Sequence, residues 1–352
     1  MRPGAEAAAP GAARDGKAPS PLGWPPDPAR WRPDPFDTPW WLRGAHAQTL
    51  GGKFLRPRPD PGLVRERIDT PDGDFLDLDH ASDPDPRAPL VLLLHGLEGH
   101  TERGYVRCLM RALLERGRGV VGMNFRSCSG EPNRRARFYH SGDTGDLDVV
   151  LAHLRARHPG RPLAAVGVSL GGNVVLRWLG ERGEAARGVL AAAAVVSVPF
   201  DLAAGARALE ASLMGRVYAG YFLRSLKAKL EAKRALLEGV IDLDAALAAR
   251  TMRAFDEVVT APLHGYASAD DYYARAASGP LVPAVRVPTL VVHALDDPFL
   301  PRERVPLDSL RANPMVAEAI VPRGGHVGFI TGRTPGRRTF WMENQVARWL
   351  GG

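Results

Sequence analysis

The stretch Gly167-Val-Ser-Leu-Gly-Gly172 lies between two runs of different periodicity. Before it comes the apolar run Pro162–Val166, which is typical of a buried strand, and after it comes Asn173–Leu179, whose apolar residues recur with the helical period. A strand, a sharp turn with Ser169 at its apex and a helix are the setting of a nucleophile elbow. The flanking glycines avoid a clash between strand and helix, and the helix N-terminus favours negative charge on the serine oxygen. Because so short a motif also occurs by chance, the rest of the chain decides its meaning.

Apolar runs alternate with helical runs on both sides of this stretch. Residues Val64–Asp69 and Phe75–Asp79, separated by a turn that contains proline and glycine, predict a hairpin. Further strands are predicted at Pro89–Leu94, Val120–Phe125, Pro162–Val166, Val189–Val198, Thr289–His293 and Val316–Val321, and helices at about Tyr105–Arg116, 142–157, Asn173–Leu179 and Thr339–Leu350. This alternation predicts an α/β fold with a mostly parallel central sheet flanked by helices on both faces.

The alternation stops between residues 200 and 280, which contain no strand candidates. Helices are predicted there at Leu202–Arg216, Tyr218–Glu238, Leu243–Met252 and Asp270–Ala277. We therefore expect a core of residues 61–199 and 281–352 with a helical lid inserted at 200–280. Residues 1–35, rich in Ala, Gly, Pro and Arg, predict a disordered leader. Residues 36–60, with adjacent tryptophans, predict a strap that packs on the core or, alternatively, lines the substrate pocket.

Three reactive side chains follow predicted strands: Ser169, an aspartate at position 296 or 297, and His326. Parallel strands place their carboxyl ends at one edge of a sheet, so these groups are expected to meet there. A serine needs a neighbouring imidazole to take its proton, and the imidazole needs a carboxylate to orient it. The sequence therefore predicts a Ser169–His326–Asp297 triad. Asp297 is preferred because it directly precedes a proline, and the reverse assignment, with Asp296 as the acid, stays open.

An oxyanion formed at Ser169 needs two backbone donors. The amide of Leu170, the residue after the nucleophile, is the first. The loop His95-Gly-Leu-Glu-Gly99, which follows an earlier strand, predicts the amide of Leu97 as the second. We expect His95 to orient this loop rather than to act as a base.

Composition and motifs argue against several other classes. The net charge is +7, but the basic residues are scattered and no nucleic-acid-binding signature occurs; a weak contact with an anionic membrane surface stays open. We expect no cofactor and no metal, since phosphate-loop, dinucleotide and zinc motifs do not occur. The two cysteines, Cys108 and Cys128, predict no disulfide framework. With no signal-peptide pattern and no apolar run of about 18 residues, the sequence predicts a cytoplasmic protein without a transmembrane segment.

Several stretches resemble one family of hydrolases. They are Trp41-Leu-Arg-Gly-Ala-His-Ala-Gln-Thr49, His95–Gly99, Asn124–Asn133, Tyr139–Asp143, Gly167–Asn173, Phe255-Asp256 and Asp296–Pro298. With these stretches the chain resembles the α/β-hydrolase superfamily and, within it, the YheT-like family of hydrolases and lipid esterases. The resemblance implies the same triad and an activity of the carboxylesterase or acylglycerol-lipase type. It departs from the family pattern at Ser127, where glycine is usual, and at Gly44-Ala45, where Asn-Pro is usual.

The sequence thus predicts a serine hydrolase that cleaves a small-molecule or lipid-like ester through an acyl-enzyme on Ser169. Two alternatives stay open: an acyltransferase with the same triad, and a non-catalytic binding protein that uses the same cleft. Apolar residues of the predicted lid suggest a hydrophobic acyl chain, namely Leu213, Met214, Tyr218, Tyr221 and Phe222. Most of these are expected to pack the lid onto the core. The acyl chain length, the headgroup and the oligomeric state are left open.

Overall fold

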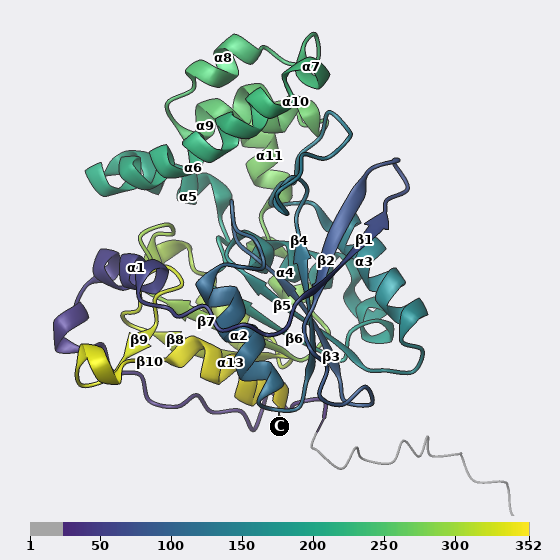
Figure 1. The fold of residues 1–352 in the computed structure, drawn as a ribbon. Helices are drawn as coiled ribbons and strands as arrows, with labels where there is room; N and C mark the ends of the chain where they lie inside the picture. Colours follow the sequence, from purple (N-terminus) through teal and green to yellow (C-terminus); the bar gives the residue numbers. More distant parts are fainter. Residues whose placement is uncertain (1–23, 352) are drawn as a thin grey trace, which may run out of the picture.

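An eight-stranded sheet forms the central layer of the protein, which a computed structural model describes from residue 24 to residue 351 (Figure 1). The strand order is β1-β2-β4-β3-β5-β6-β7-β8. The bounds are β1 Val64–Asp69, β2 Phe75–His80, β3 Leu90–Leu94, β4 Gly119–Asn124, β5 Leu163–Val168, β6 Ala192–Val196, β7 Thr289–Ala294 and β8 Val316–Val321. Within this sheet, only the β1–β2 and β2–β4 pairs are antiparallel. The predicted hairpin and the predicted mostly parallel sheet are confirmed.

Helices cover both faces of the sheet, so its inner strands are buried on both sides. Every residue of β3, β5, β6 and β7 is buried, as expected for covered parallel strands. On one face, Val91 and Leu93 share an apolar cluster with α2 (Gly104–Leu114) and α13 (Trp341–Gly351). On the other face, Leu92 and Leu94 share a cluster with α3 (Thr144–Arg157) and α4 (Leu170–Arg182).

Residues 200–280 contain helices and turns and no strand, as predicted, and they lie beyond one edge of the sheet (Figure 1). The helices are α5 Leu202–Ala211, α6 Leu213–Ala232, α7 Arg234–Leu237, α8 Leu243–Ala248, α9 Met252–Phe255, the π-helix η3 Asp256–Thr260, α10 Ala261–Leu263 and α11 Ala269–Ala276. Together with Phe138, side chains of this segment form an apolar cluster separate from the two beside the sheet. We refer to residues 200–280 as the covering segment.

Several helix boundaries in the covering segment differ from the prediction: α6 ends at Ala232 rather than Glu238, residues 252–263 form helices that were not predicted, and two further differences have a local cause. The first break lies at Ser212 rather than near Val217, and the third predicted helix is split at Thr251. Both residues have extended backbones, and their hydroxyls accept hydrogen bonds from the amides of Gly215 and Ala254. Each therefore acts as an N-cap, a signal that the apolar periodicity does not reveal.

The N-terminal part of the chain packs against the C-terminal helix. Trp31 meets Trp349 edge to face with ring centroids 5.5 Å apart, and the Asp34 amide donates to Gln345 Oε1 at 2.9 Å. Residues 24–35 contain no helix or strand, but these contacts correct the expectation that they are disordered; residues 1–23 of the predicted leader lie outside the described residues. The last helix begins at Trp341 rather than Thr339, because β10 (Thr339–Phe340) pairs with β9 (Ile330–Thr331).

The turn between β5 and α4 depends on close backbone contacts. A Cβ on Gly171 would lie 2.5 Å from the His95 carbonyl oxygen and 2.7 Å from that of Leu94. A Cβ on Gly167 would collide with the backbone of Gly171. The crowding inferred from the sequence is therefore present, and it sets how closely α4 approaches β3 and β5.

Within residues 24–351, no helix is long and apolar enough to cross a bilayer.

We expect Gly171→Ala to lower the free energy of unfolding by at least about 1–3 kcal/mol, because backbone atoms must move to admit the methyl group. Gly145→Ala is the matched control. A Cβ there has no neighbour closer than 4.0 Å, and alanine is favoured over glycine in a helix by roughly 0.5–1 kcal/mol. Urea unfolding of both variants checks this. Equal stabilities would mean that the elbow does not need glycine.

Candidate active site

Ser169 occupies the sharp turn between β5 and α4 with φ 56° and ψ −119°. This left-handed backbone is unfavourable for a residue with a side chain, so surrounding contacts must hold it. One such contact is the hydrogen bond from the Ser169 amide to the Val196 carbonyl oxygen at 2.8 Å. The nucleophile-elbow geometry predicted from the sequence is therefore present, with the serine immediately before the first turn of α4.

His326 lies between Ser169 and Asp297. Its Nε2 is 2.9 Å from Ser169 Oγ, and its Nδ1 is 2.8 Å from Asp297 Oδ2. The Asp297 side chain is 1 % exposed, and its Oδ1 accepts a hydrogen bond from the Phe299 amide at 2.8 Å. Since ionised Asp297 can only accept, Nδ1 carries a proton and Nε2 is free to accept one from the serine hydroxyl. The structure brings together all three side chains that the sequence predicted.

Asp296 faces a different part of the same loop. Its Oδ1 accepts hydrogen bonds from the amides of Gly324 and Gly325, both at 2.8 Å. These two glycines directly precede His326, so Asp296 fixes the backbone that carries the histidine. Of the two assignments left open by the sequence, the geometry favours Asp297 beside the imidazole and Asp296 as the cap of its loop.

The strap also holds the histidine loop. In α1 (Ala45–Phe54), Thr49 Oγ1 accepts from the His326 amide at 2.9 Å and donates to the Ala45 carbonyl at 2.7 Å. The side chain of Gln48 is buried and pairs with both the amide and the carbonyl of Ile330. No residue of 36–60 is among those that line the pocket. Of the two interpretations of the strap, packing on the core is therefore favoured over lining the pocket.

The loop that contains Leu97 is held by the buried ring of His95 and the half-buried side chain of Tyr105. His95 Nδ1 is 2.8 Å from the Gly96 carbonyl, and Nε2 accepts from the Phe125 amide at 3.2 Å. Burial lowers the pKa of His95 to about 3, so the ring is neutral and has the structural role expected. The Tyr105 hydroxyl accepts from the Gly96 amide at 2.8 Å. Leu97 and Leu170 both line the pocket, and neither amide donates a hydrogen bond to another residue among 24–351.

Glu98 joins this loop to the covering segment, a connection that the sequence analysis missed. Its carboxylate is 2 % exposed and accepts from Lys229 Nζ at 2.7 Å and from the Tyr139 hydroxyl at 2.8 Å. Ser225, one turn before Lys229 on α6, also donates to it. Removing one partner of such a buried ion pair typically costs about 3–5 kcal/mol. The position of α6 and that of the Leu97 loop are thus tied together.

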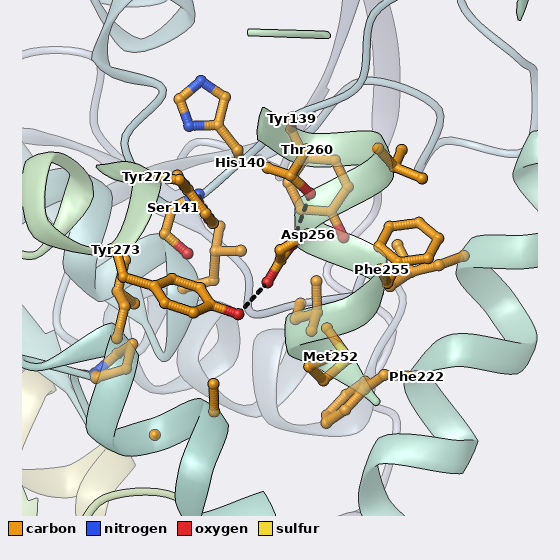
Figure 2. A pocket seen from close by; sticks show the side chains of 18 of the residues that line it. Tyr139, His140, Ser141, Phe222, Met252, Phe255, Asp256, Thr260, Tyr272 and Tyr273 are labelled. Carbon is orange, nitrogen blue, oxygen red and sulfur yellow. Dashed lines mark hydrogen bonds between the residues drawn. The ribbon is translucent and has the colours of Figure 1, made fainter. Parts of the chain in front are cut away.

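A pocket with a cavity volume of about 150 Å³ opens at Ser169 and His326. Its walls come from loops that follow the strands and from the covering segment. Much of its lining is apolar: Leu97, Leu202, Leu209, Phe222, Leu226, Leu230, Met252, Phe255, Val259 and Leu263. Figure 2 shows Phe222, Met252 and Phe255 near one another, with polar groups across from them.

Within residues 24–351, no group of three or more His, Cys, Asp and Glu side chains could hold a metal ion.

Of the five apolar residues suggested for the acyl pocket, only Phe222 lines it. Leu213 and Tyr221 are 72 % and 42 % exposed. Tyr218 packs against Phe299, and the Phe299 ring stacks on His326 with centroids 4.2 Å apart. The Tyr218 hydroxyl is 3.1 Å from His46 Nδ1. The face of α6 that carries Leu213 and Tyr221 is turned away from the pocket, which is lined instead by Phe222, Leu226 and Leu230 of α6, by residues of α5 and by residues of the later helices.

The sheet order, the elbow and the histidine loop together match a known family model. Residues 89–333 match the model described as the alpha/beta hydrolase fold. The chain belongs to the α/β-hydrolase family. It is 38 % identical to esterase YheT of Escherichia coli over 310 residues, which cover 87 % of this chain and 89 % of that protein. Phospholipase ABHD3 of Mus musculus is 32 % identical over 308 residues, or 85 % and 74 % of the two chains.

A solved structure of the Pyrococcus furiosus esterase Pf2001 has the same fold. It superposes with a TM-score of 0.52 at 16 % identity and covers 82 % of this chain and 92 % of its own. The family resemblance that the sequence indicated is confirmed by the family model and by the similarity to YheT.

We expect Asp297→Asn to lower kcat by up to about four orders of magnitude, because an amide can hold the imidazole in the wrong tautomer. Asp296→Asn should lower kcat far less, since an amide oxygen can still accept from the two glycine amides. Steady-state hydrolysis of a p-nitrophenyl ester measures the chemistry, and urea unfolding measures stability. If Asp296→Asn gave the larger loss of kcat with unchanged stability, the two aspartates would exchange roles.

Proposed function

We propose that this protein hydrolyses carboxylic esters through a covalent acyl intermediate on Ser169. The observation that carries the proposal is the unbroken chain of hydrogen bonds from Ser169 through His326 to Asp297, together with the largely apolar pocket that Ser169 and His326 line. Relatives named as an esterase and as a phospholipase support the reaction class.

In the first half of the reaction, Ser169 Oγ attacks the ester carbonyl carbon while His326 Nε2 takes the hydroxyl proton. Asp297 stabilises the imidazolium that forms. The tetrahedral intermediate then collapses, the C–O bond to the alcohol breaks, and His326 returns the proton to the leaving oxygen. In the second half, His326 Nε2 takes a proton from water while the water oxygen attacks the acyl carbon. The C–O bond to Ser169 Oγ then breaks and His326 gives the proton to that oxygen, which releases the acid and restores Ser169.

The amides of Leu97 and Leu170 are assigned to the oxyanion that forms at the carbonyl oxygen. Both residues line the pocket, and the two amides have no acceptor among residues 24–351. One such donor typically contributes about 2.7–4 kcal/mol to transition-state stabilisation. The Glu98–Lys229 pair and the His95 ring then serve catalysis indirectly, because they hold the backbone of the loop that carries Leu97.

The covering segment is assigned the role of a lid that forms the acyl pocket. Leu226 and Leu230 of α6 and Met252 and Phe255 of α9 face the same cavity as Ser169. Burying a methylene group contributes about 0.8 kcal/mol, so this lining favours esters with an apolar acyl chain over acetate. A transferase reaction, in which an alcohol replaces water at the acyl-enzyme, uses the same residues and is the alternative to hydrolysis.

Ser169→Ala should lower kcat for ester hydrolysis by on the order of a millionfold, since it removes the nucleophile. It should also abolish covalent labelling by a fluorophosphonate probe while the unfolding free energy stays near that of the wild type. Ser309→Ala, on α12 (Leu307–Ala312) and outside the pocket, is the matched control. Wild-type protein that is folded but neither labelled nor active would favour a non-catalytic binding protein, and ester formation with an added alcohol would favour a transferase.

We expect kcat/KM to rise from p-nitrophenyl acetate to p-nitrophenyl octanoate, by up to about fourfold for each buried methylene. Leu226→Asn, which places an amide on the apolar wall, should reduce the octanoate-to-acetate ratio several-fold. Leu236→Asn changes an exposed leucine of the same segment and should leave the ratio unchanged. A ratio that is the same in the wild type and in Leu226→Asn would place the acyl chain elsewhere.

A further inference from the structure

Asp256 lines the same pocket as Ser169 and His326 but has no part in the triad. It begins the π-helix η3, in which the Ala261 amide donates to the Asp256 carbonyl. Single π-helical turns are rare and often occur at functional sites. In the Phe255-Asp256 pair, Phe255 belongs to the apolar wall, while the proposed reaction gives Asp256 no role. A carboxyl group in a largely apolar cavity therefore requires an explanation.

The hydrogen bonds of Asp256 leave room for a further donor. Thr260 Oγ1 donates to Oδ1 at 2.6 Å, and the Tyr273 hydroxyl donates to Oδ2 at 2.7 Å. Both partners are uncharged, while a carboxylate can accept about four hydrogen bonds. Burial raises the pKa of Asp256 to about 6, although the two hydroxyls favour the charged form. The group thus remains a strong acceptor near neutral pH with part of its capacity unused.

The neighbours of Asp256 make this side of the pocket polar. Figure 2 shows the Asp256 carboxyl group between Tyr273 and Thr260, with His140 and Ser141 nearby and the apolar Phe255, Met252 and Phe222 on the other side. His264 also lines the pocket, and its ring centroid is 4.3 Å from that of His140. One pocket therefore has an apolar wall and a wall of hydroxyl, imidazole and carboxyl groups.

The two imidazoles on this wall are neutral. Burial lowers the pKa of His140 to about 3 and that of His264 to about 2. The Gly142 amide donates to His140 Nδ1 at 3.1 Å, so the proton of this neutral ring is on Nε2, which can donate. The wall thus offers both donors and acceptors without a fixed positive charge.

The charge of the wall bears on which headgroup it fits. Among the described residues that line the pocket there is no lysine and no arginine, and Asp256 carries the only carboxyl group. An anionic phosphate would meet a buried carboxyl group with no cation to offset it. A neutral hydroxyl group, which both donates and accepts, satisfies the wall without burying a second charge.

Building on the proposed ester hydrolysis, we infer that Asp256 binds a free hydroxyl group on the alcohol part of the substrate. The substrate class is then an ester of an apolar acyl chain with a polyhydric alcohol, for which a glycerol monoester is the probe. The acyl chain lies along the apolar wall. A hydroxyl of the leaving alcohol donates to Asp256, and His140 and Ser141 are within the same wall to pair with its oxygen or with a second hydroxyl.

The first test uses the wild-type protein alone. The value of kcat/KM is measured for 1-decanoylglycerol, for 2,3-dimethoxypropyl decanoate, which keeps the oxygens but has no donor, and for propyl decanoate. We expect the glycerol ester to be preferred over the dimethoxy ester by about tenfold or more, as for a donor that pairs with a buried acceptor. Equal values for these two esters would overturn the inference.

The second test uses Asp256→Asn, which keeps the size of the side chain. The ratio of kcat/KM for the glycerol ester over the dimethoxy ester should fall several-fold, because the amide has one acceptor oxygen in place of two and carries no charge. Asp244→Asn, an exposed aspartate of α8, is the matched control and should keep the wild-type ratio. Labelling of Ser169 by a fluorophosphonate confirms that the variant has folded. An unchanged ratio in a folded Asp256→Asn protein would contradict the inference.

Two further substrates separate the remaining possibilities. Decanoylcholine tests a cationic headgroup, and propyl 3-hydroxydecanoate tests a hydroxyl on the acyl chain. A stronger preference for either of these, lost in Asp256→Asn, would overturn the assignment to an alcohol hydroxyl. Failure of the proposed function looks different: none of the esters is hydrolysed and Ser169 is not labelled.

Discussion

The hydrogen bond between His326 Nε2 and Ser169 Oγ is the contact on which the site depends, and it joins residues 157 positions apart in the chain. Neither side chain could hold this geometry alone. Ser169 is fixed by the turn between β5 and α4, where glycines permit contact between backbones. The loop of His326 is held on several sides, by Asp296 after β7, by Thr49 of the strap and by Ser197 after β6, whose hydroxyl accepts from the Val327 amide.

Much of this arrangement could be predicted from the sequence, because its parts are local. Three of the apolar runs that mark buried strands are followed by a reactive residue, and parallel strands place those ends together. The elbow, the neighbourhood of Ser169, Asp297 and His326, and the mostly parallel arrangement of the sheet follow from these local signals. The structural role of His95 followed in the same way, from its position at the end of β3.

What could not be predicted involves contacts between segments far apart in the chain. The pairing of Thr49 with His326, and that of Lys229 with Glu98, join elements whose approach no local pattern encodes. The pocket residues of the covering segment were misassigned for a related reason. Leu213 and Tyr221 are apolar, but which face of α6 meets the cavity depends on how the helix packs, and these two side chains lie on the exposed face. Residues 24–35 were expected to be disordered because their own composition does not show the α13 surface they cover.

The buried pair of Glu98 and Lys229 has a consequence for how proteins of this kind diverge. The two residues are 131 positions apart, one beside the amide assigned to the oxyanion and the other in the covering segment. Replacing either residue by a neutral one leaves the other charge without its partner, so a substitution at one position alone lowers stability. A change at position 229 therefore has to be matched by a change at position 98. The segment that lines the pocket and the loop assigned to the oxyanion are thereby coupled through this pair of sites.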